Sequence, residues 1–422
     1  MSQPTQSGSA LPAHEPVISR ELLTCEDIAG ERLHEVQCAD CHTCTVRNKV
    51  MRADLEAFCA RVLGHHGVPP KEAELTARVL VAADVRGIAS HGVARLGRYL
   101  KGLKEGYIRP GIEFDVREPV PALGIIDARN GIGQVVSELA MDLALRKARD
   151  QGVGIVTVKN SNHFGIAGYY VQKAIDQGMI GVCMTNAAPL VAPTFGAEAV
   201  LGTNPIAVGA PGGKLPFLLD MATSVVPRGK LEVADRNRKQ IPIGWAVDEK
   251  GFDCTNPGQV LANMLARSGG GILPLGGRGE EFSGYKGYGL ALLVDVLCGV
   301  LSGSAFGLDV DNLAGPAAVA AGAAPRVGHF FMAIDIARFM PLEEFGKRLD
   351  GLFSMLRSSK HALDQATIYV HGEKEQIRTM LHEGGGIPIG ENVFETLRRI
   401  AKECGVDAPP TVADRIGRDA VA

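Results

Sequence analysis

The sequence predicts a mixed α/β protein. Short apolar runs such as "GIVTV" and "IGVCMT" alternate in the middle of the chain with the helical patterns "VVSELAMDLALRKARDQG" and "AGYYVQKAIDQG". Apolar residues also recur at helical spacing towards both ends of the chain. The 422 residues, 46% of them hydrophobic and 22% charged, are enough for one large domain or two to three ordinary domains of a globular protein.

Residues 1–50 differ from the rest of the chain. They are rich in polar and small residues with little periodicity, so we expect a disordered tail. The tail contains "CADCHTC", with Cys38, Cys41 and Cys44. A zinc site would need a fourth ligand, and the haem pattern CxxCH requires export, so we expect no metal here. Because the N-terminus lacks the basic start and apolar stretch of a signal peptide, we expect a cytoplasmic protein with free cysteines.

Three further segments follow the tail. Residues 51–120 form an N-terminal helical part, in which two helices are separated by "GVPP" and a third begins at Ser90 in "SHGVARLGRYLKGLKEG". Residues 121–335 form the mixed α/β part, where 246–285 has the composition of loops and "KGYGLALLVDVLCGVLSG" that of a strong helix. Residues 336–422 hold two or three helices, which we expect to pack on the N-terminal helical part.

Composition and motif spacing exclude several classes of function. The net charge of −3 offers no basic excess for nucleic acid, and no apolar run approaches the roughly 20 residues of a membrane helix. "GIGQVV" follows a strand and precedes a helix, but Val136 replaces the third glycine of a Rossmann turn. "GAPGGK" lacks the spacing of a phosphate-binding P-loop.

Two segments carry candidate chemistry. In "VKNSNHFGIAGYY", Asn160, Asn162 and His163 stand between a strand and a helix, where they could form a turn or line a ligand site. In "SHGVARLGRYL", His91 and Arg95 are four residues apart and would share one helix face. Arginine binds carboxylates in a bidentate fork and histidine exchanges protons near neutral pH, so this pair suits an acid with a reducible carbonyl. The alternative is a capping serine, a half-buried histidine and a solvated arginine.

Further polar junctions follow or open apolar elements. Thr203 and Asn204 precede a strand, and Asp220 ends another. Lys286 lies between glycines at the start of a helix, where free N–H groups favour phosphate. Each junction alone could be turn chemistry, but together they favour a ligand site.

These motifs resemble the type-2 malate/L-lactate dehydrogenase family. The resemblance covers about Met51 to Val406 and rests on "GIASHGVARLGRY", "NSNHFGIAGYY", "TNAAPLVAPTFGAEAVLGTNPIAVGAP", "LDMATSVVPRGK" and "GYKGYGLALLVDVLCGVLSGSAFG". It implies a non-Rossmann NAD(P)-binding domain plus a helical domain built from the N- and C-terminal segments. It also implies a homodimer with active sites near the subunit boundary.

The resemblance also implies roles for single residues. Ser90 and His91 match a proton relay, and Arg95 a ligand of the substrate carboxylate. His163 matches a histidine that is the acid/base in some members and lies in a cofactor-lining segment in others. The expected catalytic residues are Ser90, His91 and His163; the expected substrate-binding residues are Arg95, Thr203 and Arg228; the expected cofactor-binding residues are His163, Phe164, Gly165, Asp220, Met221, Ala222, Tyr285, Lys286, Gly372 and Glu373.

The expected activity is hydride transfer between NAD or NADP and a small 2-hydroxy/2-oxo acid. Malate/oxaloacetate and lactate/pyruvate are the first candidates. Cyclic imino-acid or diketogulonate reduction is an alternative, but Lys230 stands where some reductases carry an aspartate and so favours the malate-like branch. An alternative of another class is a non-catalytic homologue that binds metal through the CxxCxxC segment. The sequence leaves the choice between NAD and NADP open.

Overall fold

The computed structural model describes residues 48–310 and 324–419. Most of the expected tail, including Cys38, Cys41 and Cys44, therefore lies outside the described residues. The strands are β1 (Lys49–Val50), β2 (Asp115–Val120), β3 (Leu123–Asp127), β4 (Val153–Ser161), β5 (Met179–Thr185), β6 (Ile206–Ala210), β7 (Phe217–Met221), β8 (Ala246–Val247), β9 (Gly271–Ile272), β10 (Val327–Asp335) and β11 (Ile387–Pro388). The α-helices are α3 (Arg52–His65), α4 (Pro70–Val85), α5 (Leu96–Glu105), α6 (Gly133–Gln151), α7 (Ala167–Asp176), α8 (Arg228–Arg236), α9 (Pro257–Ala266), α10 (Gly284–Asp295), α12 (Leu342–Arg357), α13 (Glu373–Gly385), α14 (Glu391–Cys404) and α15 (Val412–Asp419).

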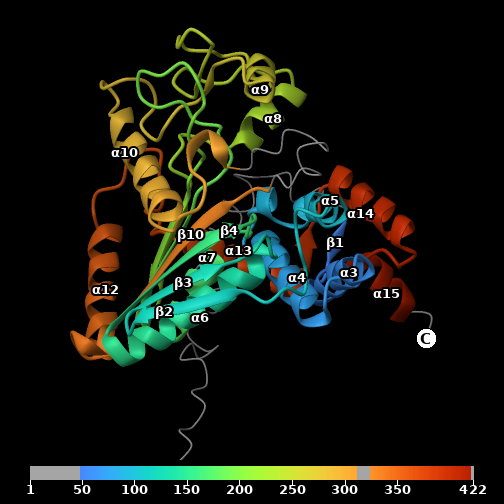
Figure 1. Cartoon of the computed structure of the whole chain (residues 1–422), viewed down its shortest axis with the longest axis horizontal. Coiled ribbons are helices and arrows are strands. Elements are labelled where there is room, and N and C mark those ends of the chain that lie inside the picture. The colour runs from blue at the N-terminus through green and yellow to red at the C-terminus, as the bar shows by residue number, and fades with distance from the viewer. Residues whose placement is uncertain (1–47, 311–323, 420–422) are drawn as a thin grey trace, which may run out of the picture. The chain divides into compact units, whose positions relative to one another are not determined.

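The predicted mixed α/β class is confirmed by a seven-stranded sheet of order β2-β3-β4-β10-β5-β6-β7 (Figure 1). Among its described strands only β3 and β4 pair in parallel, and the other neighbours are antiparallel. A doubly wound dinucleotide fold needs successive parallel strands. The sheet therefore accounts for the failure of the glycine-rich motifs to match a Rossmann turn.

Helices cover both faces of this sheet. On one face, α6 and α7 share a hydrophobic core with β3, β4, β5 and β10, in which Met141, Tyr170 and Phe331 are fully buried. On the other face, Val294 and Cys298 of α10 and the π-helical turn that continues it pack on Val182 and Phe330. Side chains that alternate along each strand enter the two cores in turn, as the period of a strand requires.

A second core joins the two ends of the described chain. Phe58 of α3, Leu80 of α4 and Leu96 of α5 are buried with Phe394 and Leu397 of α14. The short strands β1 and β11 pair antiparallel beside them. By contrast, Phe353 of α12 packs on Leu215 next to β7. The boundaries of the expected domains stay a prediction.

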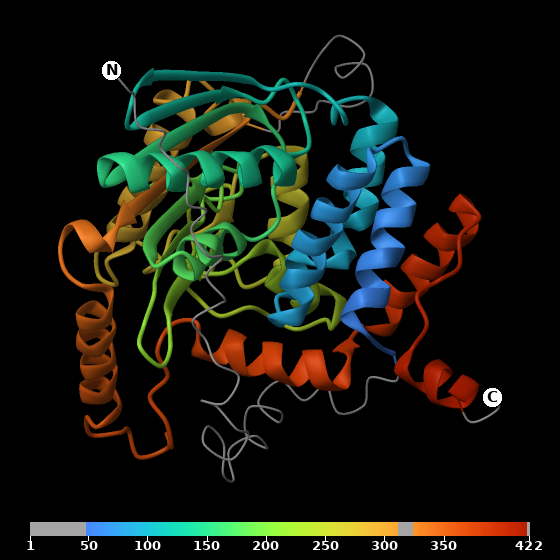
Figure 2. The same cartoon turned by 90° about the horizontal axis from the view of Figure 1, so that it is seen from below.

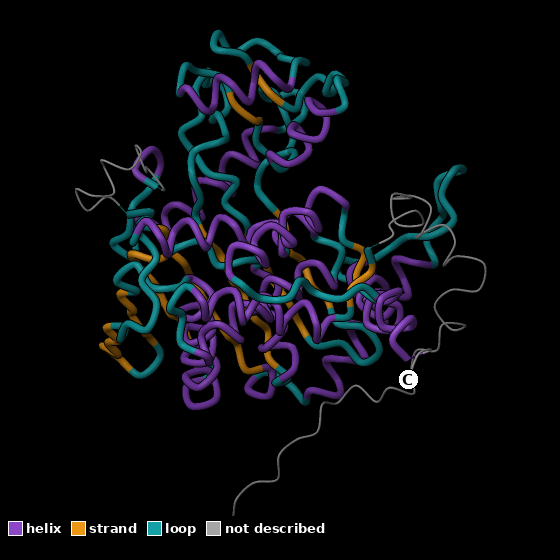
Figure 3. Tube along the Cα trace, turned by 90° about the vertical axis from the view of Figure 1, so that its right-hand side faces the viewer, coloured by secondary structure: helices purple, strands orange, loops and turns teal. Residues whose placement is uncertain are grey.

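One helical expectation was wrong. The helix expected from Ser90 begins at Leu96, because Gly92 breaks the chain into two 3-10 turns, Ala89–His91 and Val93–Arg95. The loop-rich 246–285 segment contains α9, whose N-cap Asn256 accepts a bond from Gln259 N at 3.2 Å. The short strands β8 and β9 lie near α9 in this part of the chain (Figure 3). No helix in the described ranges has the length and apolar character to cross a membrane.

Candidate active site

His163 lies just after β4, on a turn whose shape is set by two asparagines. Asn162 is 2% exposed, and its amide donates to the carbonyls of Asn130 and Gly131 at 3.0 and 2.9 Å. The Asn160 amide donates to Asp127 Oδ1 at 3.1 Å. Both asparagines thus form bonds within the turn, which is one of the two roles that the sequence left open for them.

The start of α6 packs against this turn. A Cβ added to Gly133 would stand only 2.4 Å from Asn162 O and 2.5 Å from His163 O. Only glycine permits this approach without a backbone shift. The "GIGQVV" segment therefore supports the histidine turn through close backbone contact.

His91 and His163 meet face to face although they are far apart in sequence. Their ring centroids are 5.6 Å apart and the rings are inclined by 21°. Ser90 Oγ lies 2.9 Å from His91 Nδ1, and Arg95 Nε donates to Ser90 O at 2.7 Å. The structure thus brings Ser90, His91, Arg95 and His163 together, although a bond to the backbone of Ser90, and not a shared helix face, orients Arg95.

The turn that carries His91 rests on a buried carboxylate of α4. Asp84 is 6% exposed, and its Oδ2 accepts the Val93 N–H at 2.7 Å. Burial raises the pKa of Asp84 to about 7, although the Val93 bond acts in the opposite direction. Gly92 lies so close to this carboxylate that an added Cβ would be 2.1 Å from it.

Both histidines of the pair are held in the neutral form. Burial, followed by the positive charges of Arg95 and Arg98, lowers the pKa of His91 to about 4. Burial also lowers the pKa of His163 well below its usual value, and Arg98, His91, Arg95 and His329 add to the effect. At neutral pH the pair can therefore donate or accept a proton without a resident charge.

Sequence reasoning missed Tyr99, a buried residue of α5. Its hydroxyl lies 2.6 Å from His163 Nδ1, and the same nitrogen accepts the N–H of Gly165 at 3.3 Å. Burial raises the pKa of Tyr99 to about 12. The signal was available, because Tyr99 follows Arg95 by one helical turn in "SHGVARLGRYL".

A second missed residue, His329 of β10, supports the site from within the sheet. Its fully buried ring stacks on Phe164 with centroids 4.6 Å apart, and its nitrogens lie 2.8 Å from Ser161 Oγ and 2.7 Å from Thr185 Oγ1. Burial lowers its pKa to about 3. Nothing local in "GHFFMAIDI" indicates this position, because it depends on β10 lying between β4 and β5.

A cavity of about 350 Å³ lies between β7 and the start of α13. It is lined by Arg86, Ile88, Leu218, Leu219, Asp220, Met221, Tyr369, Val370, His371, Gly372, Lys374 and Glu375. Asp220 also accepts the N–H of Gly168 at 2.7 Å, at the start of the helix that follows the His163 turn. Arg86 and Ile88, which also line the cavity, stand shortly before Ser90 in the sequence.

The lining of this cavity fits a dinucleotide. Arg86 donates to Gln172 Oε1 at 3.4 Å, while its Nη1 is buried without a hydrogen-bond partner within the described chain. A buried donor of this kind suits an anionic group, and the Asp220 carboxylate can accept hydroxyl hydrogens. Lys374 adds a second positive charge, with Nζ 4.7 Å from the centroid of the Tyr369 ring. Sequence reasoning missed Arg86, which stands four residues before Ser90.

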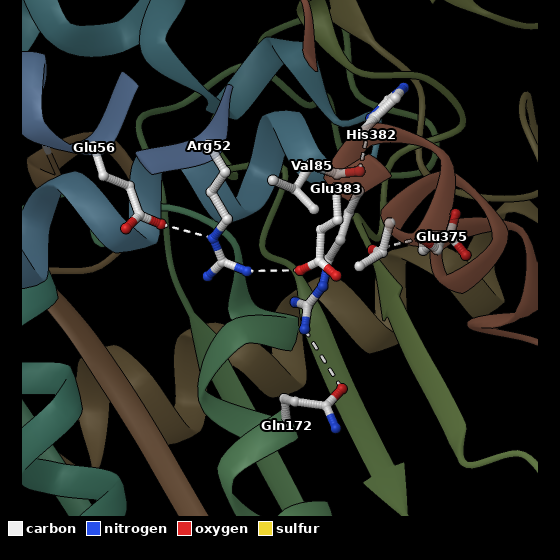
Figure 4. A network of polar contacts seen from close by, with 9 residues as sticks. Arg52, Glu56, Val85, Gln172, Glu375, His382 and Glu383 are labelled. Atoms are coloured by element: carbon white, nitrogen blue, oxygen red, sulfur yellow. Dashed lines mark hydrogen bonds and ion pairs between the residues drawn. The ribbon is translucent and has the colours of Figure 1, made fainter. Parts of the chain in front are cut away.

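Polar contacts hold the C-terminal end of α13 against α3 and α4 (Figure 4). Arg52 donates to Glu56 at 2.8 Å and to Glu383 at 2.9 Å. His382 Nδ1 donates to Val85 O at 2.8 Å, at the end of α4. Figure 2 shows α13 beside the N-terminal helices. Because the Arg52 ion pairs are partly exposed, each is worth only about 0–1 kcal/mol, and they fix position more than stability.

The other expected cofactor and substrate residues differ in their placement. Gly372 lines the cavity, whereas the Glu373 carboxylate accepts the N–H of Val370 at 3.0 Å and pairs with Arg357 at 3.1 Å. Ala222 directly follows Met221, which lines the cavity. Thr203 is tied to that strand end, because the Thr223 hydroxyl donates to its carbonyl at 3.2 Å.

Arg228, Tyr285 and Lys286 lie outside the histidine cluster. Arg228 pairs with Glu232 at 2.9 Å, and both charges act on Arg95. Tyr285 and Lys286 lie in the first turn of α10, and within the described chain they do not line the cavity. In the described ranges no three His, Cys, Asp or Glu side chains are placed to hold a metal.

Comparisons with known proteins identify the family of this chain. A family model described as malate/L-lactate dehydrogenase matches residues 50–398. The malate dehydrogenase of Pyrococcus horikoshii is 46% identical over 359 residues, which cover 85% of this chain and 96% of that protein. The L-sulfolactate dehydrogenase of Methanocaldococcus jannaschii is 40% identical over 346 residues, 82% of this chain and 94% of its own. The solved structure of Entamoeba histolytica malate dehydrogenase superposes with a TM-score of 0.82 at 32% identity, covering 87% of this chain and 100% of that one.

Proposed function

The chain belongs to the malate/L-lactate dehydrogenase family and is an NAD(P)-dependent 2-hydroxy-acid dehydrogenase, and on this premise we propose that it interconverts malate and oxaloacetate. Its cofactor is a nicotinamide dinucleotide, NAD or NADP; a more distant relative is named as NADP(+)-dependent. The observation that carries the proposed substrate is the presence of two further arginines, Arg98 and Arg228, near Arg95. Burial lowers the pKa of Arg95 most, the charges of Arg98 and Arg228 lower it further, and Tyr99 and Glu232 raise it.

A substrate with two carboxylates matches this charge better than one with a single carboxylate. Arg95 Nε is fixed on Ser90 O, so the terminal amino groups of its guanidinium can bind the carboxylate beside the carbonyl. The second carboxylate of oxaloacetate would face Arg228, and pyruvate has no such group. Sulfopyruvate carries the same charge as oxaloacetate and is the second candidate, also supported by the relative named L-sulfolactate dehydrogenase.

The stacked histidines then act on the substrate oxygen. One of them would exchange the proton with this oxygen and the other would donate a hydrogen bond to it. When bound, the reduced cofactor supplies the hydride that the carbonyl carbon accepts. Arg86, Asp220, Met221 and Gly372 would hold the cofactor in the cavity.

We propose a homodimer, supported by an apolar stripe on α10 and its π-helical extension. Leu292, Leu293, Val296, Val300 and Leu301 are 45%, 43%, 44%, 58% and 60% exposed. Val296 and Val300 follow Leu292 at intervals of four, so these side chains lie on one side of the helix. An exposed apolar stripe of this extent typically marks a protein interface.

The proposal includes a cytoplasmic location. The cysteines of the described chain are Cys59, Cys183, Cys254, Cys298 and Cys404, and all are free and buried. Free thiols are typical of reducing compartments.

The test is the oxidation of NADH and of NADPH by the full-length protein. Oxaloacetate, pyruvate, sulfopyruvate, diketogulonate and piperideine-2-carboxylate would be compared by kcat/KM. We expect oxaloacetate to be the best substrate, and the Arg228→Gln variant to lose more kcat/KM for oxaloacetate than for pyruvate. Equal losses for both acids, or a preference for pyruvate in the unmodified protein, would contradict the charge argument. A preference for sulfopyruvate would select the second candidate.

A further inference from the structure

The two groups that bond His163 Nδ1 determine where the ring carries its proton. Gly165 contributes a backbone N–H, which can only donate, so Nδ1 must present its lone pair. The Tyr99 hydroxyl, 2.6 Å from the same nitrogen, must then also be a donor. A neutral imidazole that accepts at Nδ1 carries its hydrogen on Nε2.

The charges around His163 keep its imidazole neutral near neutral pH. The groups that face His163 are cationic or neutral, namely Arg95, Arg98, His91 and His329, and burial acts in the same direction. They hold the pKa of His163 low, so the ring stays neutral. Burial keeps Tyr99 protonated, because its pKa is raised to about 12.

We propose that Tyr99 is a positioning residue that fixes His163 as the Nε2–H tautomer, so that His163 donates a hydrogen bond to the carbonyl oxygen of the bound acid. This inference rests on the proposed function, in which a 2-oxo acid binds beside the histidine pair. Ser90 places no such constraint on His91, because a hydroxyl can either donate to Nδ1 or accept from it.

The two histidines therefore have different tasks. In the oxidation direction, the O–H proton of the 2-hydroxy acid moves to neutral His91, the electron pair of the C–H bond leaves as hydride to the oxidised cofactor, and the C=O bond forms. His91 then releases its proton to solvent past the exposed Ser90. His163 keeps its proton throughout and stabilises the partial negative charge on the oxygen.

The tautomer can be read directly, without substrate or cofactor. Full-length protein labelled with ¹⁵N-histidine would be studied by long-range ¹H–¹⁵N correlation, with the His163 signals assigned by their loss in His163→Gln. We expect the Nε2–H pattern in the unmodified protein and a mixture of tautomers in Tyr99→Phe. We also expect kcat of Tyr99→Phe to fall about 10-fold or more, with KM for the 2-oxo acid changed by less than about 3-fold.

Tyr170→Phe is the matched control. Tyr170 is also fully buried, and its hydroxyl donates to Phe164 O at 2.5 Å, one residue from His163, without touching the imidazole. Both variants lose one buried hydroxyl, so their Tm values should fall by similar amounts. The His163 tautomer should nevertheless remain Nε2–H in Tyr170→Phe.

Several outcomes would overturn the inference. An Nδ1–H signal in the unmodified protein would refute the tautomer, and an unchanged tautomer in Tyr99→Phe would show that Gly165 alone is sufficient. A shifted tautomer with an unchanged kcat would remove Tyr99 from catalysis. If the unmodified protein shows the Nε2–H pattern but reduces none of the acids tested, the substrate proposal fails while the tautomer assignment stands.

Discussion

Replacing Asp84 with asparagine should remove a large part of the pH dependence of stability in this protein. Asp84 is buried beneath the turn that carries His91, and its carboxyl pKa is raised from 3.8 to about 7. The folded state therefore holds the Asp84 proton over a range in which the unfolded chain has released it. The stability that this proton confers is fully present below about pH 4 and is lost as the pH rises through about 7.

The size of the effect follows from the shift in pKa. A shift from 3.8 to about 7 is about three pH units, and each unit corresponds to about 1.4 kcal/mol, so the whole change is on the order of 4 kcal/mol. The asparagine side chain of the variant would not titrate, and its amide oxygen could still accept the Val93 N–H. A new amide NH₂ without a partner would cost about 1–3 kcal/mol, independent of pH.

The assay is urea unfolding of both proteins at one protein concentration, followed by circular dichroism from pH 5 to 8.5. The unfolding free energy of the unmodified protein should fall relative to that of Asp84→Asn by about 1.4 kcal/mol per pH unit up to about pH 7, and the difference should then level off. Other titrating groups, such as His382, are present in both proteins, so their contributions to the pH dependence cancel in the difference between the two unfolding free energies. Parallel curves across this range would refute a raised pKa at Asp84.

Four further predictions follow from the site and its surroundings. Arg95→Ala should raise KM for oxaloacetate about 10- to 150-fold, because a charged hydrogen bond is worth about 1.5–3 kcal/mol, with steady-state kinetics as the measurement. Arg86→Gln should weaken NADH binding by a similar factor in calorimetry; unchanged affinity would mean that the cavity holds something else. Gly133→Ala should lower kcat and cost about 1–3 kcal/mol of stability in a denaturant titration, because the added Cβ displaces the backbone at His163. Val296→Glu should shift the mass measured by light scattering from dimer to monomer, and an unchanged mass would place the interface elsewhere.

Local patterns predicted the elements of this fold better than their arrangement. Strong periodicity in "VVSELAMDLALRKARDQG" predicted α6, and the β-like run "IGVCMT" predicted β5. The helix expected from Ser90 failed because Gly92 and the buried Asp84 carboxylate interrupt it, and Asp84 reaches this turn only through tertiary packing. The confirmed family came from several motifs in order, not from any single one.

The candidate site was predictable where its residues form local motifs and hidden where distant strands meet. Ser90, His91, Arg95 and His163 were expected and lie together. His329 was missed because only the sheet order brings it under Phe164. The sequence left the role of Asn162 open, because an amide at a strand end suits a ligand as well as a turn, and the bonds to Asn130 and Gly131 show its part in the turn.

The insertion of β10 between β4 and β5 determines when the active site can form during synthesis on the ribosome. Neither β4 nor β5 has its central partner until the whole segment from Thr185 to Val327 has been made. At about 5–20 residues per second this takes on the order of ten seconds, during which both strand edges stay open to other chains. Because β10 also carries His329, the support under Phe164 forms only after β10 has been made. Nascent chains halted before β10 should therefore bind chaperones and lack a formed histidine pair.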